Sequence, residues 1–66
     1  MKIKINSVEH DLPEGTTLAA AIVACGIRPE GIAAAVNGSV IPKNAHASTT
    51  LTEGDSIIII KAFYGG

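Results

Sequence analysis

Polar and apolar residues alternate along the start of the chain, in a pattern typical of β-strands. Residues 1–6 place their apolar side chains at odd positions and their lysines at even ones. Such a period of two, with one apolar face, predicts a half-buried strand. Asn6-Ser7 suits a tight turn and residues 8–12 continue the alternation, so the two segments are expected to form a hairpin. Pro13-Glu14-Gly15 then interrupts the pattern.

A helix is predicted over residues 18–25, where the chain is rich in alanine and other good helix formers. Thr16 or Thr17 can cap its start, because a hydroxyl oxygen accepts a hydrogen bond from an amide of the first turn. Gly26 and Pro29 follow, and both end helices. The apolar side chains of the segment share one helical face: Leu18, Ala21, Ile22 and Cys25.

A second hairpin is predicted after the helix. Residues 32–36 form its first strand, Asn37-Gly38 its two-residue turn and residues 39–41 its second strand. Pro42 stops that strand. Residues 43–50 are polar and irregular, with room for a short helical turn.

The last predicted element is a long strand over residues 56–63, introduced by the turn Glu53-Gly54-Asp55. Its four consecutive isoleucines suit a strand that is buried on both faces and central in its sheet. The order of elements is therefore ββαββ followed by one more strand. One helix can cover only one face of the sheet, so we expect a two-layer α+β sandwich and a single domain over residues 1–66.

Composition narrows the class of protein. The chain has 66 residues, 47% of them hydrophobic, which is enough for one small core and leaves no room for a deep substrate pocket. We therefore do not expect an independent enzyme. The net charge is −1 with the basic residues spread along the chain, and this argues against nucleic-acid binding.

The location of the protein can also be anticipated. No apolar run approaches the ~20 residues of a membrane span. The alternating start lacks the apolar middle region of a signal peptide, and a single cysteine makes no internal disulfide. These features predict a cytoplasmic protein without a membrane segment.

The most chemically suggestive feature is the closing Gly65-Gly66. An α-carboxyl group usually has a pKa of about 3.3–3.7, so it is an ionised nucleophile at neutral pH. Such a carboxylate can attack the α-phosphate of ATP, and a sulfur donor can convert the acyl-adenylate to a thiocarboxylate. Glycine has no Cβ to clash when a tail threads into a partner's active site. The alternative is that the two glycines are a frayed end or a cloning remnant.

Several segments, taken in order, show a family resemblance. The order of elements resembles the β-grasp fold of ubiquitin, and the residues themselves resemble the ThiS family of sulfur carriers. The resemblance spans the whole chain. The matching segments are Lys2 to Asn6, Glu14-Gly15-Thr16-Thr17-Leu18, Ala35-Val36-Asn37-Gly38, Glu53-Gly54-Asp55-Ser56-Ile57 and Gly65-Gly66.

The resemblance implies a mechanism. A ThiF-like adenylyltransferase would use ATP to adenylate Gly66, and a cysteine desulfurase or another donor would supply sulfur. The thiocarboxylate would then deliver sulfur to thiazole synthase for the thiazole ring of thiamine. The chain would bind no cofactor, would be a carrier and not an enzyme, and would be a monomer when free.

A partner surface is also implied. By resemblance to ubiquitin, Ile57 and Ile59 face the helix together with Ile3, Ile5 and Ile32. Ile58 and Ile60 then lie on the open face beside Ala33 and Ala35, where exposed apolar residues tend to mark partner sites. The alternative is that residues 43–50 fold over that face. Phe63 and Tyr64 either anchor a partner next to Gly65 or, in the case of Phe63, cover the sheet edge.

The remaining candidate residues favour structural roles. Cys25 invites a persulfide, but its place on the apolar helix face predicts a small buried hydrophobe. His10 and His46 have no companion ligands at metal-site spacing, so we expect no metal.

Three other functions remain open. The small subunit of molybdopterin synthase shares the fold and tail chemistry, but that family resembles longer chains with prolines before the glycines, which Ala62-Phe63-Tyr64 lacks. A ubiquitin-like protein modifier would join Gly66 to a lysine, yet residues 62–64 carry none of the arginines of ubiquitin's tail. A β-grasp binding module would not need a free terminus.

Overall fold

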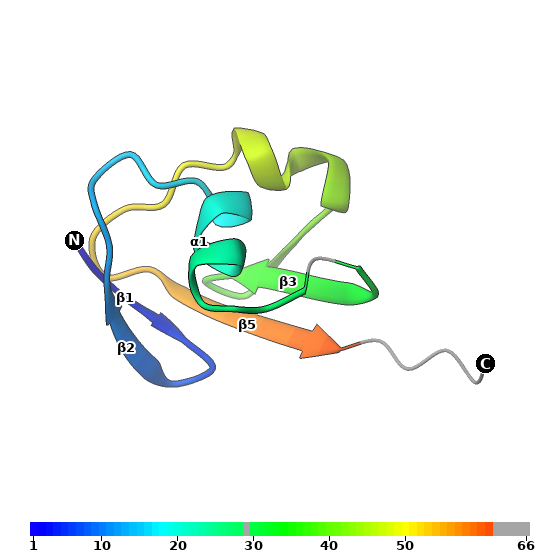
Figure 1. The fold of residues 1–66 in the computed structure, drawn as a ribbon, viewed down its shortest axis with the longest axis horizontal. Helices are drawn as coiled ribbons and strands as arrows, with labels where there is room; N and C mark the ends of the chain where they lie inside the picture. Colours follow the sequence, from blue (N-terminus) through cyan, green and yellow to red (C-terminus); the bar gives the residue numbers. More distant parts are fainter. Residues whose placement is uncertain (29, 62–66) are drawn as a thin grey trace.

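A five-stranded sheet with one α-helix on one face forms the body of the protein, as the hydrophobic pattern predicts (Figure 1). The computed structural model describes residues 1–28 and 30–61. The order of strands across the sheet is β2-β1-β5-β3-β4. The elements are β1 (Lys2–Ile5), β2 (Val8–Asp11), α1 (Leu18–Ala24), β3 (Ile32–Val36), β4 (Ser39–Ile41), the 3₁₀-helix η1 (Lys43–Ser48) and β5 (Ser56–Lys61).

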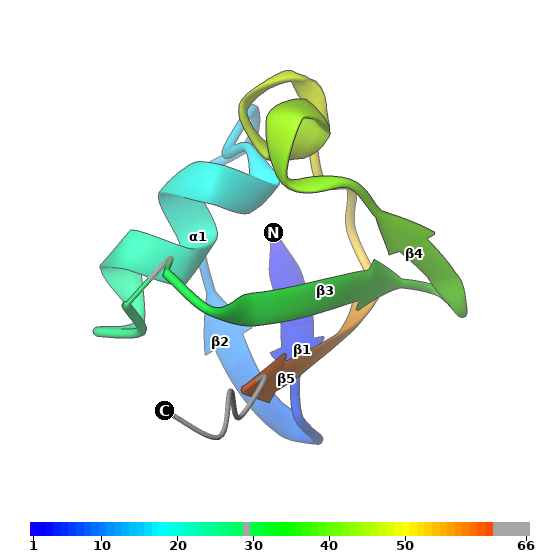
Figure 2. The ribbon, with the colours of Figure 1, turned by 90° about the vertical axis from the view of Figure 1, so that its right-hand side faces the viewer.

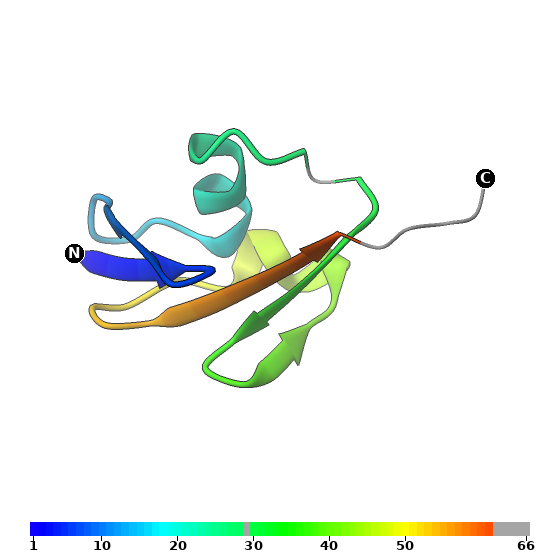
Figure 3. The same cartoon turned by 90° about the horizontal axis from the view of Figure 1, so that it is seen from below.

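The central strand β5 joins two hairpins. It runs parallel to β1 and antiparallel to β3, and Figure 3 shows it between the β1/β2 and β3/β4 hairpins. Both predicted turns are confirmed. Asn6 and Ser7 have φ of 50° and 70°, and Asn37 and Gly38 have φ of 51° and 87°. Two successive positive φ angles give the turn a twist that matches the flanking strands.

The helix has the expected caps but ends one residue early. Thr17 is the N-cap, and its hydroxyl oxygen accepts a hydrogen bond from the amide of Ala20 at 3.2 Å. The hydroxyl of Thr16 instead donates to the carbonyl of Pro13 at 2.6 Å. Cys25 is the C-cap, and Gly26 follows with φ of 75°, a left-handed conformation that ends helices at little cost for glycine.

The core lies between α1 and the sheet. The prediction that Ile57 and Ile59 face the helix is confirmed, and Ile32 packs at the margin of the core. Leu51, from the segment after η1, closes one side. The buried apolar residues are Ile3, Ile5, Leu18, Ala21, Ile22, Ala34, Leu51, Ile57 and Ile59.

The interpretation of β5 as buried on both faces is wrong. Ile58 and Ile60 are 43% and 59% exposed, because none of the elements in residues 1–28 and 30–61 covers their face of the sheet. The alternative in which residues 43–50 fold over that face is also wrong. That segment contains η1, which contacts α1 on the helix side of the sheet (Figure 2). The central position of β5 is confirmed.

Two polar side chains hold β5 in register. Asn6 continues the β1–β5 ladder with its side chain. Its Oδ1 accepts from the amide of Ile59 at 2.8 Å, and its Nδ2 donates to the carbonyl of the same residue at 3.3 Å. Asn37, directly after β3, binds the start of the strand: its Oδ1 accepts from the amide of Ser56 at 2.9 Å, and its Nδ2 donates to the carboxylate of Asp55 at 2.9 Å.

Candidate functional site

The strand that leads toward the glycines, β5, is the central strand of the sheet. β5 is hydrogen-bonded to β1 on one edge and to β3 on the other, and it ends at Lys61. The predicted site residues Phe63, Tyr64, Gly65 and Gly66 lie outside the described residues, so their roles stay predictions. The structure therefore describes the platform from which the terminal segment departs.

The open face of the sheet carries an apolar patch. The strand register places Ile58 beside Ala35 and Ile60 beside Ala33, with all four side chains on the face opposite α1. The predicted grouping of these four residues is confirmed. The patch also includes Val40, which lies beside Ala35 on β4 and is 73% exposed.

Val40 was missed by the sequence reasoning although the sequence contains the signal for it. A two-residue turn at Asn37-Gly38 pairs Val36 with Ser39, and therefore Ala35 with Val40. Directly opposed residues of a hairpin share a face. Counting back from the turn would have placed Val40 on the same face as Ala35.

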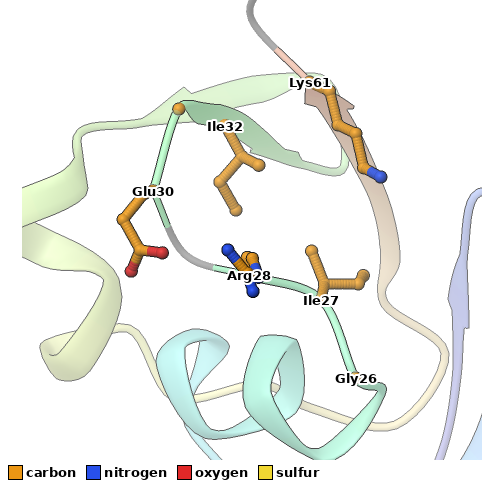
Figure 4. Close-up of a pocket in the computed structure, with 7 residues that line it drawn as sticks. Gly26, Ile27, Arg28, Glu30, Ile32 and Lys61 are labelled. Atoms are coloured by element: carbon orange, nitrogen blue, oxygen red, sulfur yellow. The ribbon is translucent and has the colours of Figure 1, made fainter.

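A surface hollow of about 510 Å³ lies at the end of β5 (Figure 4). The composition predicts no room for a deep substrate pocket, and this concavity lies on the surface, between the α1–β3 connection and Lys61. Arg28 and Lys61 were not predicted as site residues, since they are 33 positions apart in the sequence. The lining residues are Gly26, Ile27, Arg28, Glu30, Gly31, Ile32 and Lys61.

Asp55 is a buried carboxylate with a structural role. Burial alone would raise its pKa, but the amide of Thr52, the Asn37 amide group and the Thr52 hydroxyl donate hydrogen bonds that outweigh burial and lower the pKa of Asp55. The three distances are 2.8, 2.9 and 3.1 Å. A carboxylate held this way is ionised, and its oxygens already accept three hydrogen bonds from the protein. These bonds join the turn before β5 to the β3/β4 turn.

The cysteine and the two histidines have local partners. Cys25 is half-buried against the core, less than expected, and its Sγ lies 3.7 Å from Nδ1 of His10. His10 therefore has the cysteine as a neighbour, a contact that the sequence did not indicate. His46 is buried, with Nε2 3.0 Å from the carbonyl of Ile41. Within residues 1–28 and 30–61, no three His, Cys, Asp or Glu side chains gather as metal ligands would.

Comparison with known families and proteins gives a consistent result. The family model described as "ThiS family" matches residues 2–66. A thiazole synthase from Magnetococcus marinus is 32% identical over 66 residues. That match covers 100% of this chain but 20% of the relative, so the chain spans about one fifth of the length of the curated relative that it matches.

Two solved structures share the fold. A crystal structure of the thiamine biosynthesis protein ThiS from Geobacter metallireducens superimposes with a TM-score of 0.85, covering 100% of this chain and 99% of that one at 23% identity. An NMR structure of a thiamine biosynthesis protein from the same organism gives 0.78, with 100% and 88% covered at 23% identity. The five-stranded β-grasp architecture is therefore shared.

In the part of the chain that the structure describes, no helix has the length and apolarity to cross a bilayer.

Proposed function

The chain belongs to the ThiS family, and from this membership we propose that it is a sulfur carrier for thiazole formation in thiamine biosynthesis. Its working group is the carboxylate of Gly66. The observation that carries the proposal is the family match, which extends through residue 66. The fold agrees with this role, because the terminal glycines follow the central strand β5, which is hydrogen-bonded to a neighbouring strand on each side.

The proposed chemistry needs only one group from this chain. An oxygen of the Gly66 carboxylate attacks the α-phosphate of ATP, and pyrophosphate leaves. A sulfide-level nucleophile then attacks the acyl carbon, and AMP leaves with one of the former carboxylate oxygens, which gives the thiocarboxylate. Where the donor is a persulfide, the attack gives an acyl disulfide, and a thiol then cleaves it to release the thiocarboxylate and form a disulfide. A ThiF-like adenylyltransferase supplies the ATP site, and a cysteine desulfurase or another donor supplies the sulfur. The chain is consumed and regenerated, and it binds no cofactor of its own.

We propose thiazole synthase as the acceptor of the sulfur. A thiazole synthase that contains a segment similar to this entire chain supports this pairing. We expect these steps to occur in the cytoplasm, where the single, half-buried Cys25 stays reduced.

The open face is the proposed contact with the adenylyltransferase. Ile58 and Ile60 are the large apolar side chains of its centre, and exposed patches of this kind usually serve as protein interfaces. Phe63, Tyr64 and Gly65 would extend the contact along the terminal segment. Substituting Ile58→Glu or Ile60→Glu should weaken binding to the enzyme without unfolding the chain. Val23→Glu, at a helix position that is also exposed, is the matched control.

Intact-mass measurement tests the proposal directly. The chain is incubated with ATP, the adenylyltransferase and a sulfur donor, beside a variant that lacks Gly66. The expected result is a mass increase equal to one oxygen replaced by sulfur, absent from the truncated variant. Absence of the increase with an enzyme that binds the chain would sink the proposal. High-mass conjugates that survive reduction would instead indicate a protein modifier.

A further inference from the structure

The hollow at the end of β5 combines an apolar floor with charged walls. Ile27 and Ile32 are half-buried against the core and are two of the residues that line the hollow. In Figure 4, Arg28 and Glu30 approach from the α1–β3 connection, and Lys61 approaches from the end of β5. The side chains of all three charged residues are exposed. A ligand of this hollow would therefore contact aliphatic carbon at its base and cationic groups at its rim.

The two cations of the hollow are not neutralised within the described structure. Across residues 1–28 and 30–61, the only ion pair within 4 Å joins the amino group of Met1 to Asp11 at 3.5 Å. Glu30 therefore forms no direct pair with Arg28 or Lys61, although it lines the same hollow. With Arg28, Lys61 and Glu30 together, the rim carries a net charge of +1, in a chain whose total is −1.

The opposite end of the sheet is acidic. Five of the six carboxylates of the chain and three of its cations lie near the start of β5. The carboxylates are those of Glu9, Asp11, Glu14, Glu53 and Asp55, and the cations are the amino group of Met1, Lys2 and Lys4. Five negative and three positive groups give this end a net charge of −2, so a partner with an acidic surface is disfavoured here and favoured at the end where β5 leads toward the glycines.

We propose that the hollow receives an acidic side chain, flanked by an apolar one, from the adenylyltransferase that acts on Gly66. This inference rests on the proposed function for the identity of the partner. The guanidinium of Arg28 suits bidentate recognition of a carboxylate, with Lys61 as a second point charge. Ile27 and Ile32 receive the apolar neighbour. The contact is separate from the apolar patch of Ile58 and Ile60, which lies on the face of the sheet opposite α1.

This arrangement positions the terminal segment. Lys61 lies five residues before Gly66, so a contact at Lys61 fixes the departure point of that segment relative to the enzyme. Five residues span at most ~18 Å when extended, which limits where the carboxylate can reach. Binding at the hollow thus places the reacting group within a small volume of the partner's active site.

Charge reversal is the sharpest test. The variant Arg28→Glu/Lys61→Glu is compared with Lys2→Glu/Lys43→Glu, which makes the same change of net charge at exposed lysines outside the hollow. Two measurements use the ThiF-like adenylyltransferase: the Kd by titration calorimetry, and pyrophosphate release as a function of carrier concentration. The hollow variant should raise both Kd and KM at least about tenfold, with kcat at saturation nearly unchanged. The control should change them by less than about twofold.

Salt adds a second readout. The Kd of the wild-type chain should rise more steeply with ionic strength than the Kd of the hollow variant, because the variant has lost the attractive charge pairs with the enzyme. Thermal unfolding of each variant confirms that it is folded. A hollow variant that binds as tightly as wild type overturns the inference, and so does a control that loses as much affinity. Saturable binding of AMP or inorganic phosphate alone, with NMR shifts at Arg28 and Lys61, would overturn it in favour of a small-anion site.

Failure of the inference can be told apart from failure of the proposed function. If the wild-type chain gives no pyrophosphate release and no thiocarboxylate, the proposed function fails. In that case, comparing the Kd of the wild type with the Kd of the hollow variant still tests whether the hollow binds this enzyme. If the wild type is adenylated and the hollow variant matches it, the carrier function stands and the docking site falls.

Discussion

The two faces of β5 contrast sharply although they are built from the same amino acid. Ile57 and Ile59 are buried beneath α1, whereas Ile58 and Ile60 are on the open face. The first pair packs among core residues from β1, α1 and β3. The second pair has only alanines beside it on β3, which leave the isoleucines projecting. One face therefore stabilises the fold, and the other is available to a partner.

The contrast shows that apolar residues alone do not decide which face is which. Shifting a strand by one residue exchanges its two faces, and a run of identical residues fits the core in either register. The register must therefore be fixed by polar groups whose hydrogen bonds can form in one register only. Asn6 and Asn37, whose side chains bond to the backbone of Ile59 and Ser56, and the hydrogen-bonded Asp55 are such groups.

The largest expected effect is on the covered face. Ile57 has no exposed surface, so Ile57→Ala should cost about 3 kcal/mol through lost burial and a cavity. Ile58→Ala should cost less than about 1 kcal/mol, since that side chain is 43% exposed. Urea unfolding measures both, and Ile57→Val serves if the alanine variant lacks a folded baseline. Equal losses at the two positions would show that the open face is covered in solution.

Asp55 should give the next largest effect and a dependence on pH. Asp55→Asn should lower the free energy of unfolding by about 1–3 kcal/mol at pH 7, because a donor replaces an acceptor facing Thr52 or Asn37. The pKa of Asp55 is lowered on folding, so its ionised form stabilises the protein fully above about pH 4, near the unfolded pKa. That stability is lost as pH falls through the folded pKa.

The measurement is urea unfolding of wild type and Asp55→Asn between about pH 7 and pH 2. The gap between the two proteins should narrow on the acid side as wild-type Asp55 takes up a proton. A gap that stays constant across this range would contradict the assigned role of the carboxylate.

Asn6 sharpens the comparison by testing the register itself. Asn6→Gly removes both side-chain bonds to Ile59 while glycine tolerates the φ of 50°, and it should cost about 1 kcal/mol. Asn6→Ala adds the strain of a positive φ and should cost about 1 kcal/mol more. Hydrogen exchange at the Ile59 amide should accelerate in both variants. Unchanged exchange in the glycine variant would remove Asn6 from the set of register-fixing groups.

The smallest expected effect on stability belongs to Ile60. Ile60→Thr keeps a β-branched residue at a position that is 59% exposed, so the unfolding free energy should change by about 0.5 kcal/mol or less. The same substitution one residue earlier, Ile59→Thr, should cost about 2 kcal/mol. Thermal melts of the pair provide the measurement. A large loss at Ile60 would indicate that a second copy of the chain covers this face.

Local signals predicted most of the fold. The turns at Asn6-Ser7 and Asn37-Gly38, the cap at Thr17 and the terminator Gly26 depend on short-range chemistry, and each is confirmed. The two-layer architecture followed from having one helix for one sheet. The open-face position of Ile58 and Ile60 came from the resemblance to ubiquitin, whereas the isoleucine run itself suggested burial on both faces.

The rest depended on tertiary contacts that the sequence does not display. Arg28 and Lys61 line the same hollow because the α1–β3 connection leads into a strand that pairs with β5, with Ile32 opposite Lys61. Asn6 reads as a turn residue, and nothing in its neighbourhood indicates that its side chain extends a ladder to Ile59. The proposed role of Gly66 comes from the family and from the chemistry of a free carboxylate.

The parallel pairing of β1 and β5 has a mechanical consequence. A pull applied beyond Lys61 enters the fold through β5, which is bonded to β3 as far as Lys61 and to β1 at Ser56 and Ile57. Such a load acts along the strands, so the hydrogen bonds of both ladders resist in shear together and do not open one after another. The terminal segment can therefore be pulled out of a narrow active site without unfolding the domain.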